Sequence, residues 1–126
     1  KENFLCLKEN GVLELFEDNA IIIEGVEAYN VNGHTKGQQL IKISDHKINL
    51  IFCSDLIPLK SHIIPPWIMG YDLNAELTLK EKETFLNKAS KQNWTLFFYH
   101  DPSVVAIKIK KDQKYYTVTD EIRRKD

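Results

Sequence analysis

Two imidazoles and one carboxylate each follow an apolar run that is typical of a buried strand. His34 comes after residues 26–31, Asp55 after residues 48–52, and His100 after residues 94–98. Residues at the ends of neighbouring strands can meet in space although they are far apart in the sequence. Two imidazoles and a carboxylate suit zinc, iron or manganese. For each residue alone, a capping or hydrogen-bonding role is the open alternative.

The segment 33–39, which reads Gly-His-Thr-Lys-Gly-Gln-Gln, contains the first of these imidazoles. Gly33 and Gly37 permit backbone conformations that are closed to other residues. We therefore expect a tight loop that presents His34 at the end of a strand, where it can reach a metal or a substrate.

Three further residues have reactive or metal-ligating side chains. His62 lies on an irregular apolar segment after Asp55, so it is a candidate for the substrate side of the site, with a plain surface position as the alternative. His46 is expected at the tip of a hairpin, in solvent. Cys53 has no adjacent basic partner, which favours a small buried residue over a nucleophile.

Strands with short turns, and one long helix, must position these residues. Alternation of apolar and polar residues predicts strands at 12–16, 20–23, 26–31, 40–44, 48–53, 94–99, 104–110 and 114–119. The helix is predicted over 79–91, with Thr78 and Glu81 as a capping box at its start. Pro65 and Pro66 exclude a helix from the apolar segment before it. The charged residues from Asp120 onward are expected to be exposed or frayed.

Composition limits the class of protein. A chain of 126 residues with 43% hydrophobic residues predicts one domain, residues 1–126, with a real core. The net charge of -1 argues against nucleic acid as a partner. No apolar run reaches transmembrane length, which argues against a membrane partner. Cys6 and Cys53 show no pairing motif, which favours a reduced cytoplasmic protein.

These residues carry a resemblance to a known family. The motifs 33–39, Ser54-Asp55 and 99–102 (Tyr-His-Asp-Pro), in this order and with matching strands, resemble the later motifs of the metallo-β-lactamase-fold hydrolases. The similarity runs from about Val12 to the end. The stretch 55–72 is most similar to the branch related to lactonases and glyoxalases.

The resemblance implies a fold and a set of roles. The fold would be α/β, the C-terminal half of an αββα sandwich with a mixed or antiparallel sheet and one long helix. His34 would ligate one metal, His100 a second, and Asp55, the catalytic carboxylate, would bridge both. Two divalent ions, zinc first and iron or manganese as alternatives, would hold a hydroxide that attacks an ester, lactone, thioester or similar carbonyl. The substrate would be a small molecule.

The sequence departs from the family pattern in two places, and these departures change the activity expected of this chain. The first metal motif of the family, His-x-His-x-Asp-His, does not occur in the sequence, and Lys36 stands where the family commonly has proline. We therefore expect the C-terminal half of a hydrolase, inactive or nearly so by itself, that docks with the missing N-terminal half or self-associates. A metal-free structural or interaction domain that keeps the fold is the alternative from another class. A nucleic-acid-processing relative is disfavoured by the charge.

Overall fold

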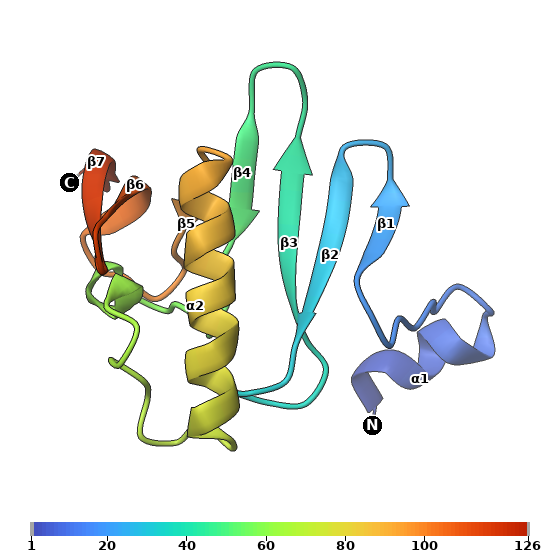
Figure 1. The fold of residues 1–126 in the computed structure, drawn as a ribbon. Coiled ribbons are helices and arrows are strands. Elements are labelled where there is room, and N and C mark those ends of the chain that lie inside the picture. Colours follow the sequence, from blue (N-terminus) through green and yellow to red (C-terminus); the bar gives the residue numbers. More distant parts are fainter. Residues whose placement is uncertain (1, 126) are drawn as a thin grey trace.

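The structure is a computed structural model that describes residues 2–125; Lys1 and Asp126 lie outside the described part. Its centre is one sheet whose seven strands lie side by side in chain order (Figure 1). They are β1 (Ala20–Ile23), β2 (Val26–Val31), β3 (Gln38–Ser44), β4 (Asn49–Phe52), β5 (Thr95–Phe97), β6 (Val104–Asp112) and β7 (Tyr115–Arg123). Neighbouring strands are antiparallel except β4 and β5, which run parallel.

The parallel pair requires a crossover connection, and α2 (Ala75–Lys91) supplies it. A 3₁₀ helix, Lys60–Ile63, lies in the irregular segment that leads to α2. Figure 1 shows α2 lying over one face of the sheet. Its buried positions recur at helical spacing, so a single stripe of α2 faces the strands. The resulting core contains Phe85, Leu86 and Ala89 of α2 together with Leu40, Ile51, Leu96 and Ile107 of the sheet.

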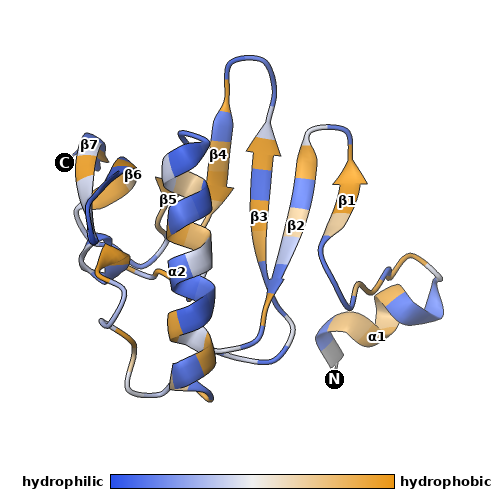
Figure 2. Cartoon of the chain, viewed as in Figure 1, coloured by the Kyte–Doolittle hydropathy of each residue, from blue (hydrophilic) through white to orange (hydrophobic). Residues whose placement is uncertain are grey.

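The opposite face of the sheet carries an unbroken line of apolar residues, here called the apolar row. Each member is the register partner of the next across five strands: Ala28, Ile41, Phe52, Phe97 and Ala106. Side chains alternate between the two faces along a strand, so the row points away from the core under α2. Figure 2 shows apolar residues recurring along these strands.

In the apolar row, Ala28 and Ala106 are buried, and the larger Ile41, Phe52 and Phe97 are half-buried. On the same face, Ile43 and Ile122 are 47% and 53% exposed. The N-terminal helix α1 (Glu2–Glu9) lies beyond β1, at the edge of the sheet (Figure 1). A partly exposed apolar face of this kind is what half of a two-sheet sandwich would leave. None of the helices within residues 2–125 has the length and apolar character needed to cross a bilayer.

Most predicted elements are confirmed, and two local expectations, the strand at 12–16 and the start of the long helix, were wrong. The strands predicted at 20–23 and 26–31 have the observed bounds. The strand predicted at 12–16 is absent, because its alternating residues have no strand partner and Leu15 is 81% exposed. The residues from Asp120 onward are largely exposed, as expected, but they are not frayed: the last strand continues to Arg123, with Asp120 and Glu121 paired to β6.

The predicted start of the long helix was also wrong. The helix begins at Ala75, and Asn74 caps it by accepting a hydrogen bond from the Leu77 N–H at 3.0 Å. Thr78 is therefore inside the first turns, 1% exposed, and donates its hydroxyl to the Asn74 carbonyl. Glu81 therefore does not cap the helix. Its carboxylate instead contacts the backbone at Asn32 and Gly33.

Candidate metal centre

Strand direction brings the three predicted residues to one edge of the sheet. Because β2 and β4 are both antiparallel to β3, and β4 is parallel to β5, the strands β2, β4 and β5 all run the same way. His34, Asp55 and His100 follow the ends of these three strands. The sequence predicts the strands, but their order in the sheet is what places the three residues together.

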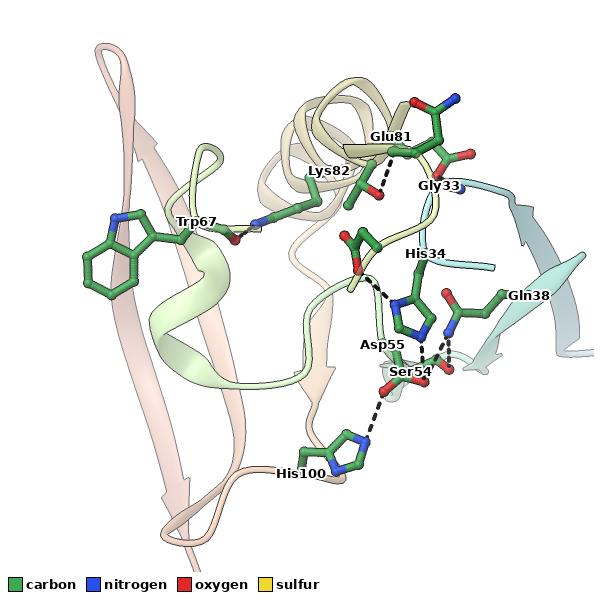
Figure 3. Close-up of polar contacts among 12 residues, drawn as sticks. Gly33, His34, Gln38, Ser54, Asp55, Trp67, Glu81, Lys82 and His100 are labelled. Atoms are coloured by element: carbon green, nitrogen blue, oxygen red, sulfur yellow. Dashed lines mark hydrogen bonds and ion pairs between the residues drawn. The ribbon is translucent and has the colours of Figure 1, made fainter. Parts of the chain in front are cut away.

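The Asp55 carboxylate lies between the two imidazoles (Figure 3). Its Oδ1 is 2.9 Å from Nε2 of His100, and its Oδ2 is 3.7 Å from Nε2 of His34. The three side chains are partly open to solvent, with exposed fractions of 13% for His34, 29% for Asp55 and 45% for His100. One carboxylate oxygen is thus directed to each histidine, and a ligand can approach all three side chains.

His34 is oriented from behind by Asp72. The Nδ1 atom of His34 lies 2.8 Å from Oδ1 of Asp72, whose side chain is 1% exposed. An ionised carboxylate only accepts hydrogen bonds, so Nδ1 of His34 donates and its Nε2 is the nitrogen that faces Asp55. A histidine held in this way by a buried carboxylate is the usual arrangement for a metal ligand. No local sequence pattern indicates this role for Asp72.

Asp55 is held by its neighbours in the chain and by β3. Gln38 donates its side-chain N–H to Oδ2 of Asp55 at 3.2 Å and to the Ser54 hydroxyl at 3.1 Å. Ser54 has a φ of 47°, the left-handed region that is uncommon for residues other than glycine. Such conformations cluster at functional sites, where the surrounding contacts maintain them. This turn separates Asp55 from the buried end of β4.

The His34 loop is fixed to α2 at Gly33. Glu81 accepts hydrogen bonds from the backbone N–H groups of Asn32 at 2.8 Å and Gly33 at 3.0 Å. A Cβ on Gly33 would lie 2.4 Å from the backbone nitrogen of Thr78. Glycine is therefore required at Gly33 by close approach to the helix. The conformational freedom expected for both glycines applies to Gly37, where φ is 77°.

His62 lies beside the centre and does not contact Asp55. It lines a hollow together with His100 and Tyr71, and with Pro58, Leu59, Met69 and Gly70. Burial lowers the pKa of the His62 imidazole, the nearby Lys82 ammonium lowers it further, and Asp72 acts in the other direction. His62 is therefore mainly neutral near pH 7. The ring of Tyr71 lies edge-on to His34, with centroids 6.1 Å apart.

The other reactive side chains lie outside the centre. His46 is at the exposed tip of the β3–β4 hairpin, as expected. Cys53 is 0% exposed, and burial raises the pKa of its thiol far above the ordinary value, so it is no thiolate nucleophile. Burial alone would raise the pKa of Asp101, but the N–H groups of Lys60, Val104 and Ser103 outweigh it and lower the pKa. Asp101 is thus a structural cap.

The donors match the chemistry of a divalent metal but do not complete a site. His34 and His100 present imidazole nitrogens on either side of a shared carboxylate, a donor set that suits zinc, iron or manganese. Within residues 2–125, however, no cluster of three or more His, Cys, Asp or Glu residues has a geometry that could hold an ion. Within the described part of the chain, these side chains therefore form only a partial donor set.

Comparison with known proteins identifies the fold. No protein-family model matches the chain, and no curated protein matches it. A probable metal-dependent hydrolase from Staphylococcus aureus is similar, with a TM-score of 0.83, 26% identity, and coverage of 93% of this chain and 42% of that one. The dizinc quorum-quenching lactonase AidC, bound to a product, gives a TM-score of 0.74 at 19% identity and covers 92% of this chain and 40% of its own.

A third solved structure extends the same result. The hydrolase AbOPH of the β-lactamase superfamily gives a TM-score of 0.73 at 18% identity and covers 98% of this chain and 43% of its own. The chain thus spans about two fifths of the length of the structures it matches. The expected resemblance is confirmed: the chain has part of the metallo-β-lactamase fold, which agrees with the predicted C-terminal half, and its structural neighbours are metal-dependent hydrolases.

Proposed function

We propose that residues 1–126 are the C-terminal half of a hydrolase that uses two divalent metal ions and acts on an ester, lactone, thioester or similar carbonyl of a small molecule. The single observation that carries the proposal is the position of the Asp55 carboxylate, with one oxygen directed to His34 and the other to His100. When bound, such ions activate water as a nucleophile and polarise a carbonyl oxygen.

Each residue of the centre has a distinct role in this proposal. His34 and His100 each supply an imidazole Nε2, and Asp55 supplies one oxygen to either side, which offsets charge on both ions. Asp72 fixes the ring of His34 through its Nδ1. Gln38 restrains the carboxylate of Asp55 through its side-chain amide. Zinc is the first candidate, since its ligands are imidazole and carboxylate groups and AidC is a dizinc enzyme.

His62 is proposed to lie on the substrate side. It lines the hollow next to His100, and its lowered pKa keeps the ring neutral near pH 7. A neutral imidazole can both donate and accept a hydrogen bond, so it can contact an ester or lactone oxygen. The apolar side chains of Leu59 and Met69 in the same hollow suit a substrate with a hydrocarbon part. AidC, a lactonase, makes a lactone the first substrate to test.

The remaining ligands are proposed to come from an N-terminal half that this chain does not contain. The apolar row on the uncovered sheet face is the surface that this half would cover. Self-association through the same face is the second possibility for the isolated chain. A single cytoplasmic domain fits the free thiols of Cys6 and Cys53, which lie in an exposed and a buried position.

The test is hydrolysis by the complete polypeptide that contains residues 1–126. Lactones and thioesters are assayed before and after removal of metal by a chelator, and again after zinc is added back. We expect zinc-dependent hydrolysis that Asp55→Asn abolishes and His46→Ala, a substitution at the exposed hairpin tip, leaves unchanged. Residues 1–126 alone are expected to be inactive.

A metal-free interaction domain is the competing function. The observation that favours it is the absence, within the described residues, of a cluster that could hold an ion. In that case the complete polypeptide contains no metal and hydrolyses none of the substrates, Asp55→Asn leaves partner binding unchanged, and the apolar sheet face serves only to bind a partner.

A further inference from the structure

Lys82 is a buried lysine in the middle of α2. It is 1% exposed, and its Nζ donates a hydrogen bond to the backbone carbonyl of Trp67 at 2.5 Å (Figure 3). A second hydrogen bond goes to the backbone carbonyl of Ile64 at 3.3 Å. Burying an ammonium group is costly unless it is well partnered, so an apolar residue would be the ordinary choice at this position. Lys82 instead joins α2 to the irregular segment between His62 and Asp72.

Glu81, the preceding residue, ties the same helix to a different loop. Its two carboxylate oxygens accept the N–H groups of Asn32 and Gly33, directly before His34. Consecutive residues of a helix point in different directions. Glu81 and Lys82 therefore hold two separate loops against α2 from adjacent positions, as Figure 3 shows.

These two loops meet each other at His34. The Leu73 N–H donates to the His34 carbonyl at 3.1 Å, and the Asn74 N–H donates to the Gly33 carbonyl at 2.9 Å. Asp72 belongs to the loop that Lys82 holds, and it accepts the hydrogen bond from Nδ1 of His34. The direction of the His34 ring therefore depends on the relative position of the two loops, which α2 sets.

We propose that Glu81 and Lys82 are positioning residues: they fix the position of the His34 loop relative to the Asp72 loop, so that Nε2 of His34 faces Asp55. The inference rests on the proposed function only where it concerns the ion that His34 would ligate. The charges agree with this arrangement: burial lowers the pKa of Lys82 to about 8, and the Asp72 carboxylate counteracts part of that effect. The charge of Lys82 therefore interacts favourably with that of Asp72, the residue that orients His34.

The test compares Lys82→Met and Glu81→Gln with matched controls on the same helix. Lys80→Met and Glu83→Gln alter the same residue types at exposed positions. The complete polypeptide that contains residues 1–126 is labelled with ¹⁵N-histidine, and long-range ¹H–¹⁵N spectra report which ring nitrogen of His34 carries the proton. Zinc affinity is measured by calorimetry with zinc alone.

The expected result is specific to the site. The wild type and both controls give the Nδ1-protonated form of His34, whereas Lys82→Met and Glu81→Gln give mixed tautomers. The zinc affinity of these two variants falls by about tenfold or more, as is usual when the support of a metal ligand is lost. A form of His34 identical to that of the controls, even with a lower melting temperature, would reduce both residues to ordinary structural contacts and overturn the inference.

Two complications have separate outcomes. If Lys82→Met does not fold, Glu81→Gln, which keeps side-chain size and one acceptor oxygen, decides by the same spectra. If the wild type binds no zinc, the proposed metal function fails, and the tautomer of His34 still decides whether Glu81 and Lys82 orient the ring.

Discussion

The imidazole of His34 and the carboxylate of Asp72 are joined by a hydrogen bond of 2.8 Å across 38 residues of sequence. Asp72 is buried and accepts from Nδ1, so Nε2 of His34 is left to face Asp55. This contact fixes the ring of His34 at the end of its strand, with the lone pair on Nε2. It also explains why the segment before α2 is fixed against the His34 loop.

Replacing Asp72 tests this orientation directly. Asp72→Asn removes the negative charge that fixes the Nδ1–H form of His34, so zinc binding by the complete polypeptide is expected to weaken by about 10–100-fold. Calorimetric titration with zinc measures the change. Asp18→Asn, at an exposed position, is the control. Equal affinities for the two variants would show that Asp72 has no part in a metal centre.

Gly33 is expected to be intolerant of any side chain. The Cβ of Gly33→Ala would lie 2.4 Å from the Thr78 backbone, so the loop must move away from α2. We expect a loss of roughly 1–3 kcal/mol in the free energy of unfolding, the usual cost of overpacking, measured by urea denaturation. Gly70→Ala is the matched control, because a Cβ there meets no atom within 4 Å. Similar losses for the two variants would contradict the close approach.

Lys82 predicts a pH dependence of stability with a definite sign. Its pKa is about 8 in the folded protein, against an ordinary value of 10.5. The unfolded chain binds this proton more tightly, so burial of Lys82 is most costly below pH 8 and the cost disappears as the pH rises to about 10.5. The free energy of unfolding of the wild type relative to Lys82→Met should therefore rise between pH 8 and 10.5. A difference that stays constant or falls over this interval would show that Lys82 is not buried as a charged group.

The apolar row predicts a binding surface on the sheet. Ile43 is 47% exposed next to the row, so Ile43→Lys introduces a charge where a second layer would pack. We expect residues 1–126 to self-associate and Ile43→Lys to reduce this association, as measured by sedimentation velocity. Val12→Lys, at a position 69% exposed outside the sheet, is the control. A wild-type chain that is monomeric at every concentration would rule out the sheet face as a self-association surface.

The strand-end pattern was enough to predict where the candidate residues lie. His34, Asp55 and His100 each follow an apolar run, and the structure places them at one edge of the sheet. The order of the strands was outside the reach of periodicity, so the meeting of the three residues depended on the family resemblance. Their role as ligands remains a prediction.

The supporting residues were harder to find, for physical reasons. Asp72 and Glu81 act across long separations, which no local pattern reveals. Glu81 was assigned to a capping box because the pair with Thr78 has the right spacing, but Asn74 caps the helix one turn earlier. One signal was available: Lys82 falls on the apolar stripe of α2, between the buried residues Thr78 and Phe85. A lysine at a core position of a helix indicates a polar partner.

The most direct test is the location of zinc in crystals of the complete polypeptide that contains residues 1–126, by anomalous scattering at the zinc edge. The account predicts two peaks beside the Asp55 carboxylate, one bonded to Nε2 of His34 and the other to Nε2 of His100. Peaks that leave Asp55 uncoordinated, or zinc-saturated crystals with no peak at this edge of the sheet, would contradict it.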